Sequence, residues 1–239
     1  MATKKLAFVD SINLKGDALT LFQSHKDFIV TPLLSDTHKD VYGFYNLVGR
    51  YPNRNIKEAF RVTHFESKTS FLMVSYSNSY SEYTLDNGDR GRIYDYTIHF
   101  AGLKSYTSKG ENLLEVLISL TDNLIYYLIS RIDIATDSKI RPSRLLSKLD
   151  ADTNRSKTTF KNTTYWNQRS RSVTVAYYDK GLKANLPFKL HRVEYRFSGQ
   201  YLNNNFHFSN DGIKALYKRL ETYIYKAFNE SIKIQNPFF

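Results

Sequence analysis

Two short segments in the second half of the sequence, residues 131–137 and 191–197, carry charged side chains at nearly every second position. The positions between them hold mainly apolar side chains such as isoleucine, valine and phenylalanine. Because side chains alternate between the two faces of a β-strand, each segment is expected to form a strand with one charged and one apolar face. The charged positions are Arg131, Asp133, Asp137, Arg192, Glu194 and Arg196.

A third segment, residues 173–180, alternates in the same way and ends in a reactive pair. Two valines and Tyr177 share the apolar parity, whereas Tyr178 and Lys180 share the other. If the apolar faces of all three strands turn toward the helices, Tyr178 and Lys180 join the charged face. Parity alone therefore favours Tyr178 over Tyr177 as a functional residue.

The chemistry that such a face could perform is phosphoryl transfer. Neighbouring strands lie about 4.8 Å apart, so Asp133, Asp137 and Glu194 would fall within ~10 Å, the reach of one metal site. Carboxylates and water suit Mg²⁺ or Mn²⁺, which would polarise a phosphate. A phenol with a pKa of ~10 needs that ion, or an ammonium such as Lys180, to act as a nucleophile at neutral pH. The alternative is that the acids and arginines are cross-strand ion pairs that set register, each worth about 0.2–1 kcal/mol.

The remaining patterns predict the elements around this face. Strands are expected at 6–14, 27–33, 41–47, 59–65, 70–76, 91–100, 127–137, 173–180 and 189–197, with a hairpin turn at 86–91. Helical spacing of apolar residues predicts helices at 111–125 and 210–230, and Pro142 is placed to begin another. The pattern predicts an α+β fold with a largely antiparallel twisted sheet. Helices would pack on one face, leaving an open face for the active site.

The net charge of +11 is unevenly distributed over the 239 residues. Residues 1–125 hold 14 basic and 14 acidic side chains, whereas residues 126–239 hold 20 basic and 9 acidic ones. Concentrated Lys and Arg with interleaved aromatic residues favour a nucleic-acid partner over a merely solvated surface. We therefore expect a strand-rich N-terminal half of unknown function, 1–125, and a basic catalytic half, 126–239, or one continuous domain.

Several classes of protein are excluded by composition. The chain has no Cys, which excludes disulfides, thiolate chemistry and a Cys-based zinc site. Its apolar runs are shorter than the ~18 residues of a membrane span, and Asp10 interrupts the first of them too early for a signal peptide. These features predict a cytoplasmic protein without a membrane partner.

Four short motifs in the second half occur in a fixed order. They are Ser130-Arg-Ile-Asp133, Thr164-Tyr-Trp-Asn-Gln-Arg-Ser-Arg171, Ala176-Tyr-Tyr-Asp-Lys-Gly181 and Arg192-Val-Glu194. In this order and spacing they resemble the rolling-circle replication initiators of filamentous phages and, more loosely, the plasmid initiators of the Rep_trans family. The resemblance covers about residues 93–203, whereas the first ninety residues match no family that we can name.

The resemblance implies an enzyme that nicks and rejoins an origin strand of DNA. Tyr178, followed by Lys180, would attack one phosphodiester, keep the 5′-phosphate as a phosphotyrosine and release a 3′-OH for a host polymerase. Asp133 and Glu194 would hold Mg²⁺ or Mn²⁺, and Asp137 matches an acid of the plasmid branch only. The His-apolar-His metal motif of many rolling-circle nucleases is not present in the sequence.

The same resemblance, together with the charge pattern, predicts which residues contact DNA, either a single strand or an origin hairpin. Trp166 and Tyr165 could stack on unpaired bases, although Trp166 is equally consistent with the core. The basic and polar residues expected to contact phosphate are Arg131, Arg169, Ser170, Arg171, Arg192 and Arg196. The chain has no Walker A sequence, so strand separation would need a host helicase.

Two other functions remain open from the sequence. The first is a non-catalytic DNA-binding protein on the same scaffold, in which the acids serve only as ion pairs. The second is a relaxase for conjugative transfer, which shares the nicking chemistry.

Overall fold

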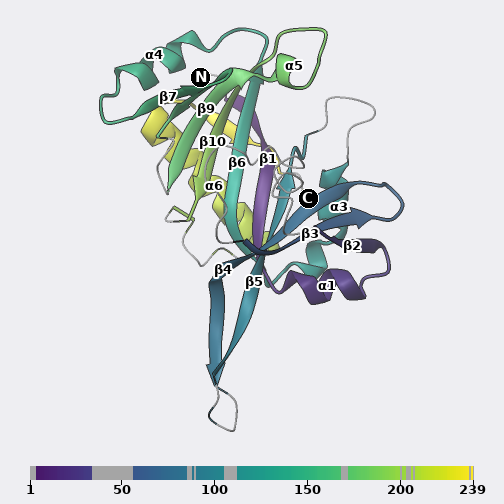
Figure 1. The fold of residues 1–239 in the computed structure, drawn as a ribbon. Helices are drawn as coiled ribbons and strands as arrows, with labels where there is room; N and C mark the ends of the chain where they lie inside the picture. The colour runs from purple at the N-terminus through teal and green to yellow at the C-terminus, as the bar shows by residue number, and fades with distance from the viewer. Residues whose placement is uncertain are drawn as a thin grey trace.

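The computed structural model describes residues 4–33, 56–84, 88, 90–104, 112–167, 172–199, 201–202, 206, 208–236 and 238 of the chain. These residues form an α+β fold in which helices pack against one face of a large, mainly antiparallel sheet (Figure 1). The fold class predicted from the sequence is confirmed.

Within the described residues the sheet has eleven strands, and ten of them follow the order β2-β3-β4-β5-β1-β6-β10-β9-β8-β7. Their bounds are β1 Lys5–Gly16, β2 Phe28–Pro32, β3 Ile56–His64, β4 Ser70–Thr84, β5 Arg90–Ala101, β6 Leu128–Ser138, β7 Lys157–Phe160, β8 Thr163–Trp166, β9 Val173–Asp179, β10 His191–Ser198 and β11 Ile232–Ile234. β1 pairs antiparallel with both β5 and β6, and β11 pairs parallel with β1. β1 therefore joins strands from the two halves of the chain in one continuous sheet.

The helices are mostly short. They are α1 Ala18–Ser24, α3 Leu113–Ser119, η1 Thr121–Asn123, α4 Ser143–Ala151, α5 Lys180–Lys183 and α6 Asn210–Phe228. The sequence marks both ends of α6, because the side chain of Ser209 accepts a hydrogen bond from the N–H of Gly212 at 3.2 Å and Asn229 adopts a left-handed conformation with φ of 51°. Both are common helix-terminating devices.

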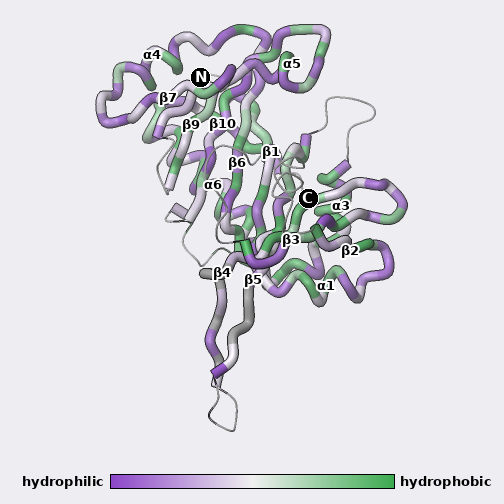
Figure 2. The backbone as a smooth tube through the Cα atoms, in the orientation of Figure 1, coloured by the Kyte–Doolittle hydropathy of each residue, from purple (hydrophilic) through white to green (hydrophobic). Residues whose placement is uncertain are grey.

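The main hydrophobic core lies between the sheet and these helices. The stripe Ile213, Leu216, Leu220 and Ile224 of α6 is buried against the apolar face that the alternation in β6, β9 and β10 creates. In Figure 1, α6 runs behind these strands, and Figure 2 shows hydrophobic and hydrophilic positions alternating along β1 and β6. Burial of each large aliphatic side chain contributes about 1.5–3 kcal/mol.

Several boundaries differ from the sequence prediction. The helix expected at 111–125 is shorter in the structure. The α-helix α3 ends at Ser119 with Leu120 as its C-cap, and only the 3₁₀ turn η1 follows it. The strand expected at 41–47 lies outside the described residues. α1, β7, β8 and β11 were not predicted, because they are too short to show a clear period.

β4 is much longer than the strand predicted at 70–76. It continues to Thr84, which pairs with Arg90 of β5 across the predicted hairpin turn. The outer part of this hairpin extends well beyond the rest of the sheet (Figures 1 and 2). None of the helices in the described part of the chain is long and apolar enough to cross a membrane.

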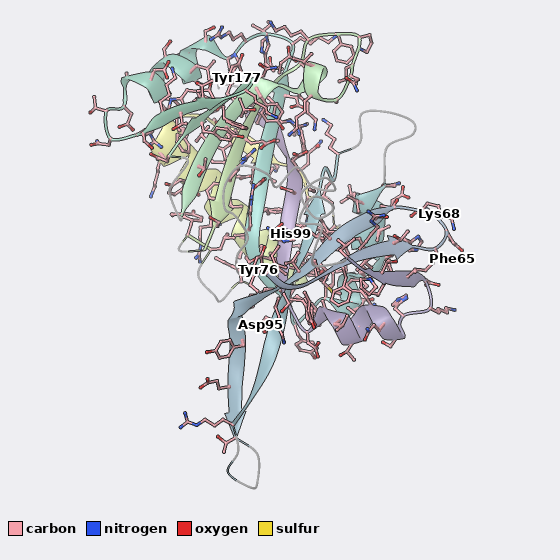
Figure 3. All side chains as sticks on the ribbon, viewed as in Figure 1. Phe65, Lys68, Tyr76, Asp95, His99 and Tyr177 are labelled. Carbon is pink, nitrogen blue, oxygen red and sulfur yellow. The ribbon has the colours of Figure 1, made fainter. Side chains whose placement is uncertain are left out.

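His99 of β5 provides a test of stability against pH. Burial, reinforced by the positive charge of Arg131, lowers the pKa of the His99 imidazole to about 4 (Figure 3). The folded state thus disfavours a proton that the unfolded state takes up near pH 6.5, so the free energy of unfolding should fall as the pH drops from 6.5 toward 4. One pKa unit corresponds to about 1.4 kcal/mol, so the fall is up to about 3 kcal/mol. Denaturant titrations at a series of pH values measure this dependence. In His99→Gln the free energy of unfolding should change less with pH between 6.5 and 4, and an unchanged pH dependence would contradict this role of His99.

Candidate active site

The register of β6, β10 and β9 places the predicted polar residues on one face. Arg192 of β10 lies opposite Asp137 of β6 on one side and opposite Tyr178 of β9 on the other. Two positions further along β10, Glu194 lies opposite Ala135 of β6 and Ala176 of β9. Two positions beyond it, Arg196 lies opposite Asp133 of β6. The three strands therefore present these residues on one common face, as alternation along the strands predicted.

The phenol of Tyr178 contacts the carboxylate of Glu194. Its hydroxyl donates a short hydrogen bond to Oε1, across the small side chain of Ala176. The other carboxylate oxygen, Oε2, accepts from Nε of Arg196 at 2.9 Å. Tyr178 and Glu194 are each only 3% exposed, so the pair is shielded from bulk water.

Arg192 is fully buried and connects three strands. Its Nε and Nη2 donate to the two oxygens of Asp137 at 2.8 and 3.0 Å. Its Nη1 lies 2.7 Å from Oδ1 of Asp10 on β1 and 3.9 Å from Oε1 of Glu194. The guanidinium thus holds carboxylates from β1, β6 and β10 around one positive charge.

Asp10 is a member of this face that the sequence argument missed. It lies at a register shift in β1 between Val9 and Ser11, where its carbonyl accepts from the N–H groups of Gly102 and Leu103. Such a bulge breaks the alternation of buried residues. The sequence does contain a sign of this bulge. Along residues 5–16 the buried apolar residues change from odd-numbered positions, 7 and 9, to even-numbered positions, 12 and 14.

Asp133 and Asp137 are held by arginines and do not converge with Glu194. The carboxylate of Asp133 accepts from Arg131 at 2.8 and 2.7 Å and from the hydroxyl of Ser11 at 2.8 Å. Among the described residues, no group of three or more His, Asp or Glu side chains is arranged to hold a metal ion. These side chains, as arranged, do not fit a Mg²⁺ or Mn²⁺ site with all three acids as ligands.

The expectation that these groups face open solvent is wrong. Asp133, Tyr178 and Glu194 are each 3% exposed and Arg192 is 0% exposed. Part of the reason is that the long side chains of the face cover one another. Phe8 packs on Arg192 at 5.1 Å, Tyr165 on Arg196 at 5.4 Å, and Nζ of Lys183 lies 4.8 Å above the ring of Tyr178.

This environment sets the protonation of the central groups. Burial, reinforced by the charge of Glu194, raises the pKa of the Tyr178 phenol far above its ordinary value. Burial would also raise the pKa of Glu194, but Arg196, the Tyr178 hydroxyl and Arg192 together lower it below the ordinary value. Burial, aided by Arg192, lowers the pKa of the Lys180 ammonium. Burial raises the pKa of Asp10, and nearby Glu194 adds to this effect against the opposing charge of Arg192.

The predicted DNA contacts are placed in different environments. Trp166 is 2% exposed, packs in the main core and donates its indole N–H to Asp150 at 3.1 Å, so it does not offer a base-stacking surface. Arg192 is likewise buried, so the structure contradicts its predicted phosphate contact. Tyr165 is half-buried on the polar face, and Arg131 and Arg196 are engaged with acids. The residues Arg169, Ser170 and Arg171 lie outside the described part of the chain.

A groove of about 520 Å³ reaches Tyr178 at the end of β9. Two basic side chains, Arg141 and Lys189, line it together with the acid Asp179. The remaining lining residues are Asn162, Thr164, Tyr177, Tyr178, Leu182 and His191. Thr164, Tyr177 and His191 lie on the face of the sheet opposite the Tyr178–Glu194 contact, so the groove opens mainly on that face, at the end of the strand that carries Tyr178.

Tyr177 lies on the other face of β9, as its parity predicted. Its hydroxyl is 2.9 Å from Nδ1 of His191, and the two rings stack with centroids 5.9 Å apart (Figure 3). The guanidinium of Arg141 lies 5.8 Å from the Tyr177 ring. Consecutive tyrosines therefore have different partners, a histidine for Tyr177 and a carboxylate for Tyr178.

Comparison with models of known protein families and with curated protein sequences finds no match. Among solved structures, the chain is similar to a rolling circle replication initiator protein from Geobacillus stearothermophilus, with 14% sequence identity and a TM-score of 0.41. The similarity covers 82% of this chain and 75% of that chain. Similarity at this level does not identify the reaction, which depends on the side chains described above.

Loss of the buried guanidinium should be strongly destabilising. Arg192→Met leaves the buried Asp10 without the guanidinium and removes one cation of half-buried Asp137, which also lies 4.0 Å from Lys104, so the free energy of unfolding should fall by about 3–5 kcal/mol. Denaturant unfolding at pH 7 measures this change. The triple variant Asp10→Asn, Asp137→Asn, Arg192→Met should recover part of the loss, and a single-variant loss below about 1 kcal/mol would contradict the role of Arg192.

Gly181 allows the chain to turn directly after Tyr178 and Lys180. A Cβ at this position would lie 2.2 Å from the carbonyl oxygen of Phe188 and 2.9 Å from the backbone N of Leu190. Gly181→Ala should therefore displace the α5 turn and lower the melting temperature by several degrees. Leu182→Ala, at a neighbouring side chain that is 62% exposed, is the matched control and should leave the melting temperature nearly unchanged.

Proposed function

We propose that the protein is a replication initiator that nicks and rejoins one DNA strand through a phosphotyrosine on Tyr178. The observation that carries this proposal is the contact between the Tyr178 phenol and Glu194, with Nζ of Lys183 over the phenol ring. A nucleophile, a carboxylate that can accept its proton and nearby cations are the parts that phosphoryl transfer requires.

The proposed first step transfers a phosphoryl group from DNA to the protein. The Oη of Tyr178 attacks the phosphorus, the new O–P bond forms, and the bond from phosphorus to the 3′ oxygen breaks. The phenolic proton passes to Glu194 only as the O–P bond forms, because the lowered pKa of Glu194 and the raised pKa of Tyr178 disfavour transfer beforehand. Glu194 then returns a proton to the leaving 3′ oxygen to give a 3′-OH. The reverse sequence rejoins the ends, because the phosphotyrosine is itself a phosphodiester.

The positive charges near Tyr178 support this step. A buried phenol holds its proton tightly, so the phenolate that develops during attack needs neighbouring cations. Lys183 lies over the ring at 4.8 Å, and Lys180, the first residue of α5, is close enough to Glu194 to interact with its charge.

A divalent ion remains a prediction that comes from the resemblance. Asp133 and Asp137 are each bound by an arginine rather than turned toward Glu194, so the reaction proposed for Tyr178 and Glu194 does not use an ion held by all three acids. Nicking assays with Mn²⁺ and with a chelator address this prediction directly.

The alternative function is a DNA-binding protein without catalysis. It is favoured by one observation, which is that each of the predicted acids pairs with an arginine, as in a purely structural network. Binding without covalent attachment distinguishes it from the nickase.

The covalent intermediate provides the decisive test. The protein is incubated with a random-sequence single-stranded DNA library and Mn²⁺, denatured, and assayed for protein-linked DNA. Wild type should retain DNA whose linked 5′ ends share a sequence, and Tyr178→Phe should reduce this signal at least a thousandfold, because a phenyl ring has no nucleophilic oxygen. Peptide mapping should place the nucleotide on Tyr178.

Tyr177→Phe is the matched control, since it removes the adjacent hydroxyl from the opposite face of the same strand. It should retain the adduct. An adduct that persists in Tyr178→Phe, or one absent from wild type under all metal conditions, would refute the proposed reaction.

A further inference from the structure

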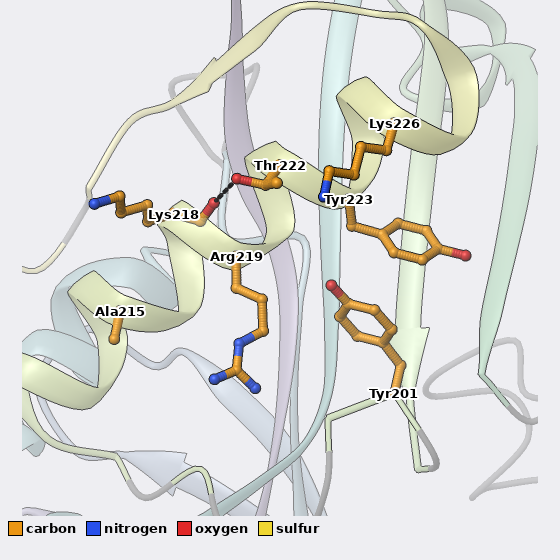
Figure 4. A pocket seen from close by; sticks show the side chains of 7 residues that line it. All are labelled: Tyr201, Ala215, Lys218, Arg219, Thr222, Tyr223 and Lys226. Carbon is orange, nitrogen blue, oxygen red and sulfur yellow. Dashed lines mark hydrogen bonds between the residues drawn. The ribbon is translucent and has the colours of Figure 1, made fainter.

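A second groove lies on α6, the helix that covers the apolar face of the sheet. It encloses about 400 Å³ and is lined by Tyr201, from the segment after β10, and by one surface of the helix (Figure 4). The helical residues are Ala215, Lys218, Arg219, Thr222, Tyr223 and Lys226. Because α6 and the Tyr178–Glu194 pair lie on opposite faces of the sheet, this groove is separate from the candidate active site.

The lining of this groove is cationic. Lys218, Arg219 and Lys226 are exposed, and the lining residues include no acid. With a rise of 1.5 Å per residue, the seven- to eight-residue spacing of these cations spans roughly 11–12 Å along the helix. A ligand with several negative charges along its length would meet all three.

Two aromatic rings form one side of the groove and pack on aromatic side chains of the core. The rings of Tyr201 and Tyr223 meet edge to face with centroids 4.7 Å apart. Both rest on Phe197 of β10, at 4.9 and 5.7 Å, and Tyr223 also contacts Phe228. Both tyrosines are half-buried, so their orientation is fixed before any ligand arrives.

We propose that this α6 groove binds a single-stranded DNA segment that is distinct from the one nicked at Tyr178. Lys218, Arg219 and Lys226 contact successive phosphates, and the tyrosine pair packs against an unpaired base. A duplex would present its phosphates but keep its bases stacked inside, so the aromatic pair favours a single strand. The choice of DNA as the nucleic acid rests on the proposed function.

A charge-reversal experiment separates this groove from the general positive charge of the protein. The test variant is Lys218→Glu, Arg219→Glu, Lys226→Glu, and the control is Lys4→Glu, Lys26→Glu, Lys68→Glu, which changes exposed lysines outside the groove by the same six charges. Both are made on Tyr178→Phe, so that only binding is measured. The probe is a fluorescein-labelled 12-nucleotide oligo(dT), followed by anisotropy at several salt concentrations.

The test variant should bind at least tenfold more weakly than the control. The slope of log K against log salt should also decrease in magnitude by about 2, since each phosphate contact on a single strand contributes about 0.7. Equal weakening in both variants would overturn the proposal, because net charge alone would then explain binding. A double-stranded probe that binds the groove as tightly as the single strand would also overturn it.

Photocrosslinking locates the bound strand without any substitution in the α6 groove. An oligonucleotide that contains 5-iododeoxyuridine should crosslink to Tyr201 or Tyr223 in the full-length Tyr178→Phe protein, and crosslinks only outside the groove would overturn the proposal. This result does not depend on nicking. Failure of the adduct assay with retained crosslinks contradicts the nickase alone, whereas an adduct without them contradicts the groove alone.

Discussion

The buried guanidinium of Arg192 is the interaction on which the polar face depends. An arginine stays charged at any accessible pH, so its burial requires carboxylates close to it. Asp137 supplies two hydrogen bonds from β6, and Asp10 supplies an ion pair from β1. This one side chain therefore ties the strand contributed by the start of the chain to the strands of the basic half.

The pairing of acids with arginines also explains why the acids of this face differ in which groups their carboxylate oxygens contact. Asp133 and Asp137 each have both oxygens engaged by an arginine, which fixes their orientation along the sheet. Glu194 instead divides its oxygens between Arg196 and the hydroxyl of Tyr178. Among the three acids proposed from the sequence, Glu194 alone contacts the candidate nucleophile in the described structure.

Alternation along β6, β9 and β10 was sufficient to predict which residues of these three strands share the polar face. It separated Tyr178 from Tyr177 and grouped Glu194 with Asp133, because the pairing of β6, β9 and β10 is regular over this stretch. It could not predict Asp10, whose bulge moves it out of the alternating pattern, nor the burial of Arg192, which depends on side chains from distant strands. Local patterns also missed β7 and β8, since each spans only four residues and is held by pairing with a neighbouring strand.

Trp166 was considered a candidate for base stacking, but its position gives it a different use. It is the single tryptophan in the sequence, and it is buried between the sheet and the helices with its indole N–H bonded to Asp150 near the end of α4. Its intrinsic fluorescence therefore comes from one defined site in the second half of the molecule. Emission from the unmodified chain reports whether the packing of β8 against α4 and the core is intact, without an attached dye.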